Sequence, residues 1–226
     1  MADIDFPAIY RGTRERIDGL VRDLPDELLD RVAPATPEWQ VRDVVAHLAG
    51  CAADLLTGNL DGLAGDTWTQ AQVDARRGRE ISDVLDEWHR CSELVDGMFQ
   101  GMDPMLRLMA LTDAVTHEHD IRGAVGAPGA RGSDAVEFGF ESVSRGIGAQ
   151  RGDSGALRIV HEAGETVVGP GDASAALRAS RFEVLRAGVG RRSYGQIAAW
   201  DWQGDALPET MVLGLFSPPR TSPLDE

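Results

Sequence analysis

The chain has 226 residues, of which 37 are acidic and 22 basic, and its formal net charge is -15 at neutral pH. This charge repels the phosphates of nucleic acids and the surfaces of anionic lipids, so neither is an expected partner. The expected partners are small molecules. The length allows one large domain or two small ones, each with a hydrophobic core of its own.

All basic residues are arginines, because the sequence contains no lysine. Schiff-base chemistry and the lysine of P-loop proteins are therefore excluded. The five histidines become the leading candidates for an acid, a base or a metal ligand. The HExxH, GxSxG, GxGxxG and EF-hand motifs are absent, which argues against metalloproteases, α/β-hydrolases, dinucleotide-binding and calcium-binding proteins.

The two cysteines, Cys51 and Cys91, lie far apart and form no CxxC pair, which is typical of proteins from a reducing compartment. The N-terminal residues lack an apolar signal segment, and no stretch approaches the roughly 18 apolar residues of a membrane span. We therefore expect a cytoplasmic protein with no membrane partner. We expect it to be a monomer or a homodimer.

Apolar residues at helical spacing predict four long helices in the N-terminal part of the chain. The first is expected to break or kink at Pro25, and a Gly- and Asp-rich loop is expected over residues 59–68. The predicted helices cover residues 6–31, 41–57, 79–99 and 104–126. Four helices with modest connections indicate an antiparallel four-helix bundle, which we assign to residues 1–130.

The sequence pattern changes after a glycine-rich joint at residues 126–132. Short runs typical of strands alternate with helical segments, which predicts a smaller α/β domain over residues 131–226. Strands are expected in 156–162, 165–169 and 174–180, and helices in 134–149 and 180–189, before a final helix-to-strand region at 196–205. The fold class is therefore α+β. We expect the tail from Ser217 to be loose.

Three side chains in the predicted bundle are candidate metal ligands. Asp113 and His117 are four residues apart, so they project from one face of their helix. His47 lies among apolar residues such as Val44 and Leu48, so it faces the interior, where an imidazole needs a partner. A divalent ion supplies that partner, and three protein ligands leave the open position typical of catalytic zinc. The alternative is a hydrogen-bonded core histidine with a separate surface Asp/His pair.

The helical period predicts which polar residues near the three candidate ligands can reach them. His119 lies about 200° around the helix from the ligand histidine two residues earlier, so we expect it to be exposed or to lie between helices. Asp43 precedes one ligand histidine by about one turn and Asp120 follows the other, so each can orient an imidazole from outside the ligand set. Arg122 can neutralise either carboxylate.

Four segments of the sequence resemble the mycothiol-dependent maleylpyruvate isomerase family of the DinB/YfiT-like superfamily. They are PEWQVRDVVAHLAG, THEHDIRGAVG, VLRAGVGRRS and WDWQGD. The likeness covers most of the chain. It implies that Trp39 precedes a valine-rich helix carrying the ligand His47, and that Asp113 and His117 are the ligands of a second helix. The sequence departs from the family pattern at Asp113, where the family has Glu, and at Gln40, where a Ser or Thr N-cap is usual.

The resemblance implies a divalent ion between the bundle and the second domain, with mycothiol as a thiol cofactor. Zinc suits a set of two histidines and an aspartate, although nickel, manganese or iron accepts the same ligands. The cation keeps the mycothiol thiol deprotonated at neutral pH. In an isomerase this thiolate adds to a cis double bond conjugated to a carbonyl, allows rotation and leaves. The implied function is an isomerase or thiol S-transferase acting on a small electrophile, such as a dicarboxylate.

A dicarboxylate substrate calls for guanidinium groups, which match carboxylates with two parallel hydrogen bonds. Arg191 and Arg192 are the candidates, with Arg122 as a further one. The alternative for Arg191 and Arg192 is that they are solvated residues at a helix C-terminus. Two other functions also fit the sequence: a metal-dependent hydrolase with an activated water, or a metal-free module for small-molecule binding or stress response.

Overall fold

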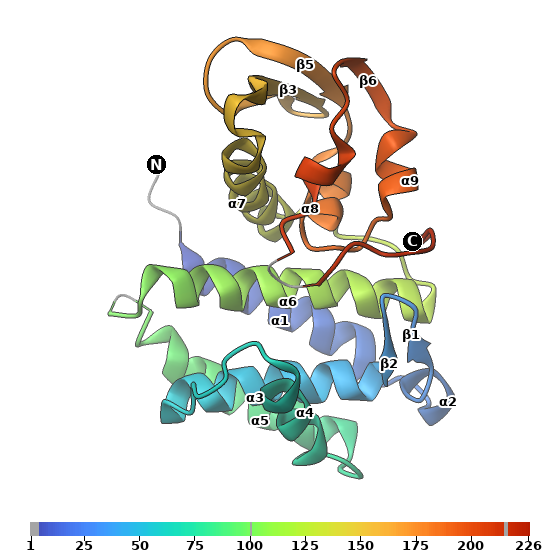
Figure 1. Ribbon diagram of the computed structural model, residues 1–226. Helices are drawn as coiled ribbons and strands as arrows, with labels where there is room; N and C mark the ends of the chain where they lie inside the picture. Colours follow the sequence, from blue (N-terminus) through green and yellow to red (C-terminus); the bar gives the residue numbers. More distant parts are fainter. Residues whose placement is uncertain (1–4, 100, 215–216) are drawn as a thin grey trace. The chain divides into compact units, whose positions relative to one another are not determined.

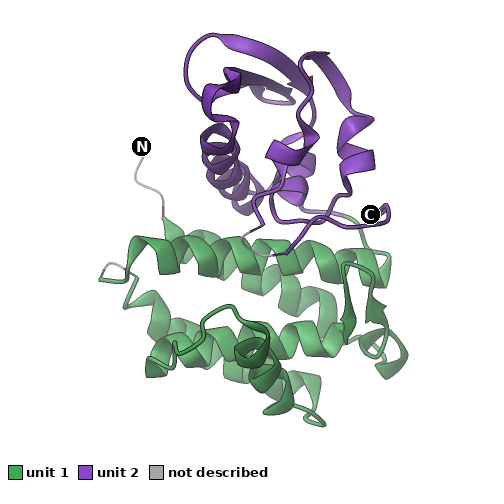
Figure 2. Ribbon diagram, in the orientation of Figure 1, with its two compact units in different colours: residues 1–128, 226 green, residues 129–225 purple. Residues whose placement is uncertain are grey.

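Figure 1 shows the computed structural model, which describes residues 5–99, 101–214 and 217–226. The chain is divided into two compact units, Met1–Pro128 with Glu226 and Gly129–Asp225 (Figure 2). The described part of the first unit is helical apart from a short hairpin, and that of the second combines helices with a four-stranded sheet. The predicted mixture of helix and sheet is confirmed. None of the described helices is long and apolar enough to cross a membrane.

Four long helices form the main body of the first unit (Figure 1). Helix α3 packs against α5 and α6, and α1 packs against α6 and α5. Their interior combines aliphatic and aromatic side chains with buried polar ones, and the fully buried Trp88 donates a hydrogen bond to the Tyr10 hydroxyl at 3.0 Å. The helices of this unit are α1 Phe6–Val21, α2 Asp26–Leu29, α3 Val41–Thr57, α4 Asp66–Asp74, α5 Ile81–Asp96 and α6 Pro104–Val125.

The limits of α3 and α6, which matter most for the site, follow from local signals in the sequence. At the start of α3, Asp43 accepts a hydrogen bond from the backbone N–H of Gln40 at 2.9 Å. At the start of α6, Asp103 accepts one from the backbone N–H of Met105 at 2.7 Å. Both helices end at a glycine with positive φ, which satisfies their last carbonyl groups. Both helices were predicted within two residues of these limits.

Two elements of the first unit were missed by the sequence analysis. Strands β1 (Val32–Ala33) and β2 (Thr36–Gln40) form a small antiparallel hairpin just before α3. Helix α4 (Asp66–Asp74) begins inside the predicted loop of residues 59–68, so the loop prediction was wrong for its last three residues, and the rest of α4 was assigned no element. The sequence of α4 lacks an apolar stripe, so the helix depends on its packing against α3 rather than on its own pattern. The predicted first helix also divides, because Pro25 separates α1 from α2.

The second unit is built on a mixed sheet with the strand order β4-β3-β5-β6. Strands β3 and β5 are parallel, and each pairs with an antiparallel outer strand. Helix α7 packs against α8, β3 and β4, over a core that includes Leu157, Ile159 and Leu177. The elements are α7 Asp134–Arg151, β3 Ala156–His161, β4 Gly164–Val168, β5 Ala173–Arg178, α8 Arg181–Gly188, α9 Tyr194–Ala198 and β6 Asp201–Gly204, with 3-10 turns at Gly152–Ser154 and Pro208–Met211.

The C-terminal tail is attached to the second unit, which corrects the prediction that it is loose. Ser217 accepts a hydrogen bond from Arg191 at 2.8 Å, and Arg220 forms a parallel bridge with Ser193. Leu224 is buried, and its backbone exchanges two hydrogen bonds with the side chain of Gln196. The Pro-rich sequence gave no periodic signal for this attachment, because it depends on single polar contacts with distant residues.

We predict that Gly50→Ala destabilises the first unit. A Cβ at this buried position of α3 would lie 2.4 Å from the Gln72 Cβ, so α4 would have to move away. Overpacking of this kind costs about 1–3 kcal/mol in the free energy of unfolding. The matched control is Gly19→Ala in α1, where an added Cβ meets nothing within 4 Å and stabilises by about 0.5–1 kcal/mol. Urea unfolding measures both variants, and equal effects would contradict the prediction.

Candidate metal centre

Three side chains from two helices meet inside the first unit. His47 comes from α3, and Asp113 and His117 come from adjacent turns of α6. Nε2 of His47 lies 3.3 Å from Oδ2 of Asp113, and Nε2 of His117 lies 3.4 Å from Oδ1 of the same carboxylate. One donor atom from each of the three lies within 4.8 Å of the other two. The structure therefore brings together the three residues that the sequence proposed as metal ligands.

Each imidazole is held through its other ring nitrogen. Nδ1 of His47 lies 2.7 Å from Oε1 of Gln72, and Nδ1 of His117 lies 2.9 Å from Oδ2 of Asp120. Gln72 is held in turn by Asp54, which accepts its amide at 2.6 Å. When Nδ1 donates to these oxygens, the Nε2 lone pair of each neutral imidazole points at the Asp113 carboxylate. Such a set of acceptors requires a cation or protons between them.

The distances fit a small divalent ion. For metal bonds of about 2.0–2.2 Å to nitrogen and oxygen, two donors at a tetrahedral angle lie about 3.3–3.6 Å apart. The two distances from Asp113 to the imidazoles fall within this range. Two imidazoles and a carboxylate form a typical donor set for zinc, and the hydrogen bonds at Nδ1 are those that ligand histidines make. The residues present therefore fit the ion that the resemblance implies.

Without an ion, the electrostatics of the site favour protonated histidines. Burial lowers the pKa of His47, but the acidic groups of Cys51 and Asp113 outweigh burial and raise it to about 10. Burial also lowers the pKa of His117, and its interactions with Asp113 and Asp120 outweigh this and raise it to about 9. Burial raises the pKa of Asp113, but the two imidazoles outweigh burial and hold this pKa far below its usual range. The carboxylate is therefore ionised throughout the physiological pH range.

Two tryptophans flank the histidines. The ring centroid of Trp39 lies 5.0 Å from that of His47 and 6.0 Å from that of His117. Trp68 on α4 approaches His47 edge to face at 6.4 Å. His47 and His117 are only 3% and 5% exposed, so the aromatic rings and helices exclude most water from the histidines. Removing water strengthens the electrostatic interactions within the site.

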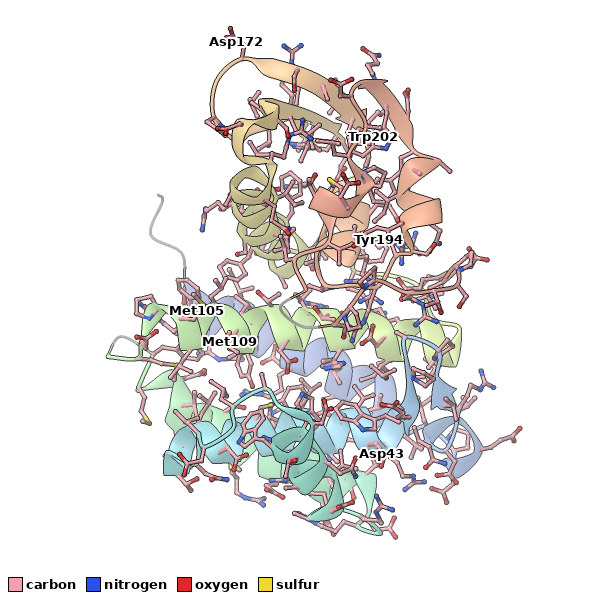
Figure 3. All side chains as sticks on the ribbon, in the orientation of Figure 1. Asp43, Met105, Met109, Asp172, Tyr194 and Trp202 are labelled. Carbon is pink, nitrogen blue, oxygen red and sulfur yellow. The ribbon has the colours of Figure 1, made fainter. Side chains whose placement is uncertain are left out.

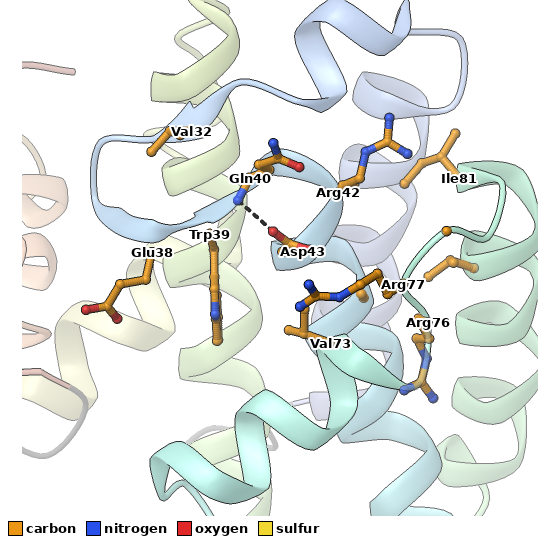
Figure 4. Close-up of a pocket in the computed structure, with 13 residues that line it drawn as sticks. Val32, Glu38, Trp39, Gln40, Arg42, Asp43, Val73, Arg76, Arg77 and Ile81 are labelled. Atoms are coloured by element: carbon orange, nitrogen blue, oxygen red, sulfur yellow. Dashed lines mark hydrogen bonds between the residues drawn. The ribbon is translucent and has the colours of Figure 1, made fainter.

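A pocket of about 490 Å³ opens beside Trp39 (Figure 4). Its wall contains three arginines, Arg42, Arg76 and Arg77, together with Asp43. Figure 4 shows Arg77 and Asp43 near Trp39, whose ring also contacts both histidines. The first unit therefore has a cavity of small-molecule size with basic groups in its wall, which shares Trp39 with the surroundings of the histidines but is not lined by the three candidate ligands.

Of the two carboxylates predicted to orient the ligand histidines, only one contacts its histidine. Asp120 contacts His117, the histidine that it was expected to orient. Figure 3 shows Asp43 at the N-terminal end of α3, where its carboxylate accepts a hydrogen bond from the backbone of Gln40 (Figure 4). Gln72 rather than Asp43 contacts Nδ1 of His47. The sequence analysis missed Gln72 because residues 69–78 were assigned no element, and no spacing relative to α3 pointed to it.

The predicted arginines are held by other groups. Arg122 pairs with the buried Glu118 at 3.0 Å, a carboxylate that the sequence analysis did not assign to it. Arg192 makes two hydrogen bonds to Glu183, at 2.6 and 2.9 Å, and Arg191 donates to the backbone of Val189. Arg191 and Arg192 are only 3% exposed, so the alternative of solvated arginines is wrong. Their role as substrate clamps stays a prediction.

The remaining histidines lie apart from the three ligands. His119 is 3% exposed, so of its two expected positions the exposed one is wrong. His89 pairs with Asp18 at 2.6 Å, on a partly exposed part of α5. His161, in the second unit, lies 3.1 Å from the Thr166 hydroxyl. One further neighbour of the centre, Cys51, was assigned no role from the sequence, although its spacing of four residues from His47 places both on one face of α3.

A family model described as the mycothiol maleylpyruvate isomerase N-terminal domain matches residues 10–126, which is more than half of the chain. The chain belongs to this family. The resemblance seen in the sequence is thereby confirmed, and the family takes its name from an enzyme, a mycothiol-dependent isomerase.

Two solved structures share the fold of this family member. One is the mycothiol-dependent maleylpyruvate isomerase and the other is a histidine-to-alanine mutant of it. Each aligns with a TM-score of 0.57 and 13% sequence identity, over 82% of this chain and 88% of the solved chain. At this identity the likeness establishes the fold alone. No curated protein sequence matches the chain.

We predict that the purified protein binds close to one zinc ion per chain, and that His47→Ala, His117→Ala and Asp113→Asn each lose it. Removing one donor leaves two, and it also leaves a buried partner without its counter-charge. Metal analysis of tag-free protein measures the content. Chelation should lower the melting temperature of the wild type and of His89→Ala but not of the three ligand variants, because an ion bound to the native state stabilises it by mass action. His89→Ala is the control, and zinc retained in all three ligand variants would contradict the prediction.

We also predict that zinc affinity rises with pH up to about pH 10, most steeply below about pH 9. Below the raised pKa values, the empty site holds protons on His47 and His117, and these protons must leave before Nε2 can bind an ion. The association constant should therefore increase by up to about tenfold per pH unit for each proton released. Competition with a chelator at several pH values measures the slope, and calorimetry in buffers of different ionisation enthalpy counts the protons. A zinc affinity that does not change with pH would contradict the prediction.

Proposed function

We propose that the protein is a metal- and mycothiol-dependent enzyme, an isomerase or thiol S-transferase, that acts on a small electrophilic substrate. The observation that carries the proposal is the convergence of Nε2 of His47, Nε2 of His117 and the carboxylate of Asp113 in a family named for a mycothiol-dependent isomerase. A divalent ion bound there supplies a cation that keeps a thiol deprotonated at neutral pH. The two free cysteines agree with a cytoplasmic enzyme.

The residues around the centre have separate tasks in this proposal. His47, Asp113 and His117 hold the ion, while Gln72 and Asp120 fix the orientation of the imidazoles. The scaffold that carries them we infer to be an antiparallel four-helix bundle of the DinB/YfiT type, over residues 1–130. The smaller α/β domain over residues 131–226 then contributes Arg191 and Arg192 to substrate binding.

The pocket beside Trp39 supports an anionic substrate or cofactor group. Arg42 pairs with both Asp26 and Asp30, whereas the side chain of Arg77 is two-thirds exposed and pairs with the exposed Asp74. Arg77 is therefore the pocket arginine most easily turned toward a carboxylate, which a planar guanidinium binds with two hydrogen bonds. This assignment favours a substrate with at least one carboxylate, such as a dicarboxylate.

We predict that the zinc-loaded protein binds mycothiol in calorimetry and isomerises a cis-configured unsaturated dicarboxylic keto acid, such as maleylpyruvate, only when mycothiol is present. Product formation is followed by NMR. His117→Ala should lose both binding and turnover with its zinc, whereas His89→Ala should keep both. Absence of mycothiol binding to the zinc-loaded protein would refute the proposal. Turnover without any thiol would instead support a hydrolase that activates water.

A further inference from the structure

A thiol lies beside the candidate metal centre. Cys51 follows His47 by one turn of α3, so the two side chains project from the same face. Its Sγ lies 3.7 Å from Nε2 of His47 and 3.9 Å from Oδ2 of Asp113. Its other polar neighbours in the described structure are Nδ1 of His47 and Oε1 of Gln72, each also at 3.7 Å, and these two atoms contact one another. The polar surroundings of the sulfur are therefore the metal centre itself.

These distances are close to those of a shared ion. With metal bonds of about 2.3 Å to sulfur and about 2.0–2.1 Å to nitrogen or oxygen, donors at a tetrahedral angle lie about 3.5 Å apart. The sulfur is 0.2–0.4 Å beyond this spacing from two of the ligands. It does not belong to the group whose donor atoms all lie within 4.8 Å of one another. A rotation about the Cα–Cβ bond of Cys51 is therefore needed to bring the sulfur to all three ligands at once.

We propose that Cys51 is a fourth, exchangeable ligand of the metal centre, which occupies the open position until an external thiol replaces it. The inference rests on the proposed function, because it concerns the same ion. Cys51 loses its thiol proton to solvent when its sulfur binds the ion. On exchange, the sulfur of the external thiol forms the new bond and its proton passes to the released Cys51 sulfur. No oxidant is needed, and the exchange leaves the charge unchanged.

The position of Cys51 explains why it can leave. The sulfur of Cys51 lies near the spacing of a shared ion from His47 and Asp113 only, whereas the donor atoms of His47, Asp113 and His117 all lie within 4.8 Å of one another. The ion should therefore hold Cys51 less tightly than the other three ligands. Cys51 is also partly exposed, so an incoming thiol can reach this side of the centre. A thiolate ligand favours zinc over the harder ions, because soft donors select soft or borderline metals. In the thiol-free state it keeps water from the ion, which limits unwanted hydrolysis.

Cobalt(II) substitution of the full chain tests this ligation without measuring turnover. The wild-type protein, loaded with cobalt in the absence of any added thiol, should show the intense near-ultraviolet charge-transfer absorption of a sulfur–cobalt bond. Cys51→Ser and Cys51→Ala should bind cobalt without this absorption. Cys91→Ser is the matched control, since the other cysteine lies on α5 and should leave the spectrum unchanged. Circular dichroism establishes that each variant is folded.

Two further measurements follow from the exchange. Chelator competition should show a zinc affinity lower by about tenfold or more in Cys51→Ala, since even groups that only orient a ligand contribute about 10–100-fold. Titration of cobalt-loaded Cys51→Ala with mycothiol should restore the charge-transfer absorption. The mycothiol concentration needed for this should be lower than the concentration needed to complete the exchange in the wild type, because the Cys51 sulfur no longer competes for the ion.

The outcomes separate this inference from the proposed function. If the wild type binds cobalt, His47→Ala loses it, and the spectra with and without Cys51 are identical, the proposed metal centre stands and the Cys51 ligation is refuted. If the wild type binds no cobalt or zinc at all, both proposals fail. Sulfur–cobalt absorption that persists in Cys51→Ser but disappears in Cys91→Ser would also overturn the assignment.

Discussion

The first unit is organised around one partly buried carboxylate that two imidazoles share. Each oxygen of Asp113 lies within 3.4 Å of a different histidine, and these histidines are almost completely buried. A negative charge largely removed from water is costly unless positive charge compensates it, and here the compensation is either protons on the imidazoles or a metal ion. Because protons and a metal ion compete for the same imidazole nitrogens, the occupancy of the site depends on the pH of the solution.

The orientation of the histidines depends on how closely the helices approach. Gly50 lets α4 pack directly on α3, and this contact brings Gln72 to His47 and Trp68 beside the ring. Helix α6 needs no such help, because Asp120 lies on its own face within one turn of His117. One imidazole is therefore fixed by a local contact and the other by tertiary packing. A change in the α3–α4 contact should affect the two histidines unequally.

The same distinction explains what could be read from the sequence. The limits of α3 and α6 and the alignment of the three ligands follow from capping residues, apolar spacing and the helical period, all of which are local. Helix α4 and the role of Gln72 depend on contacts over more than 20 residues, which no single-sequence pattern encodes. Asp43 was misplaced for a physical reason: a carboxylate in the first turn of a helix is drawn to the unpaired backbone amides there rather than to a side chain one turn away.

Asp113 also changes what the centre can contain. The side chain of Asp113 is shorter than the Glu of the family pattern, and its oxygens nevertheless lie 3.3 and 3.4 Å from the two imidazoles. Aspartate has one fewer rotatable bond, so its carboxylate loses less conformational entropy when it is fixed between them. It also fills less of the space facing α3, where Sγ of Cys51 lies 3.9 Å from Oδ2. The aspartate therefore leaves space on the α3 side of the centre for the sulfur ligand that we propose.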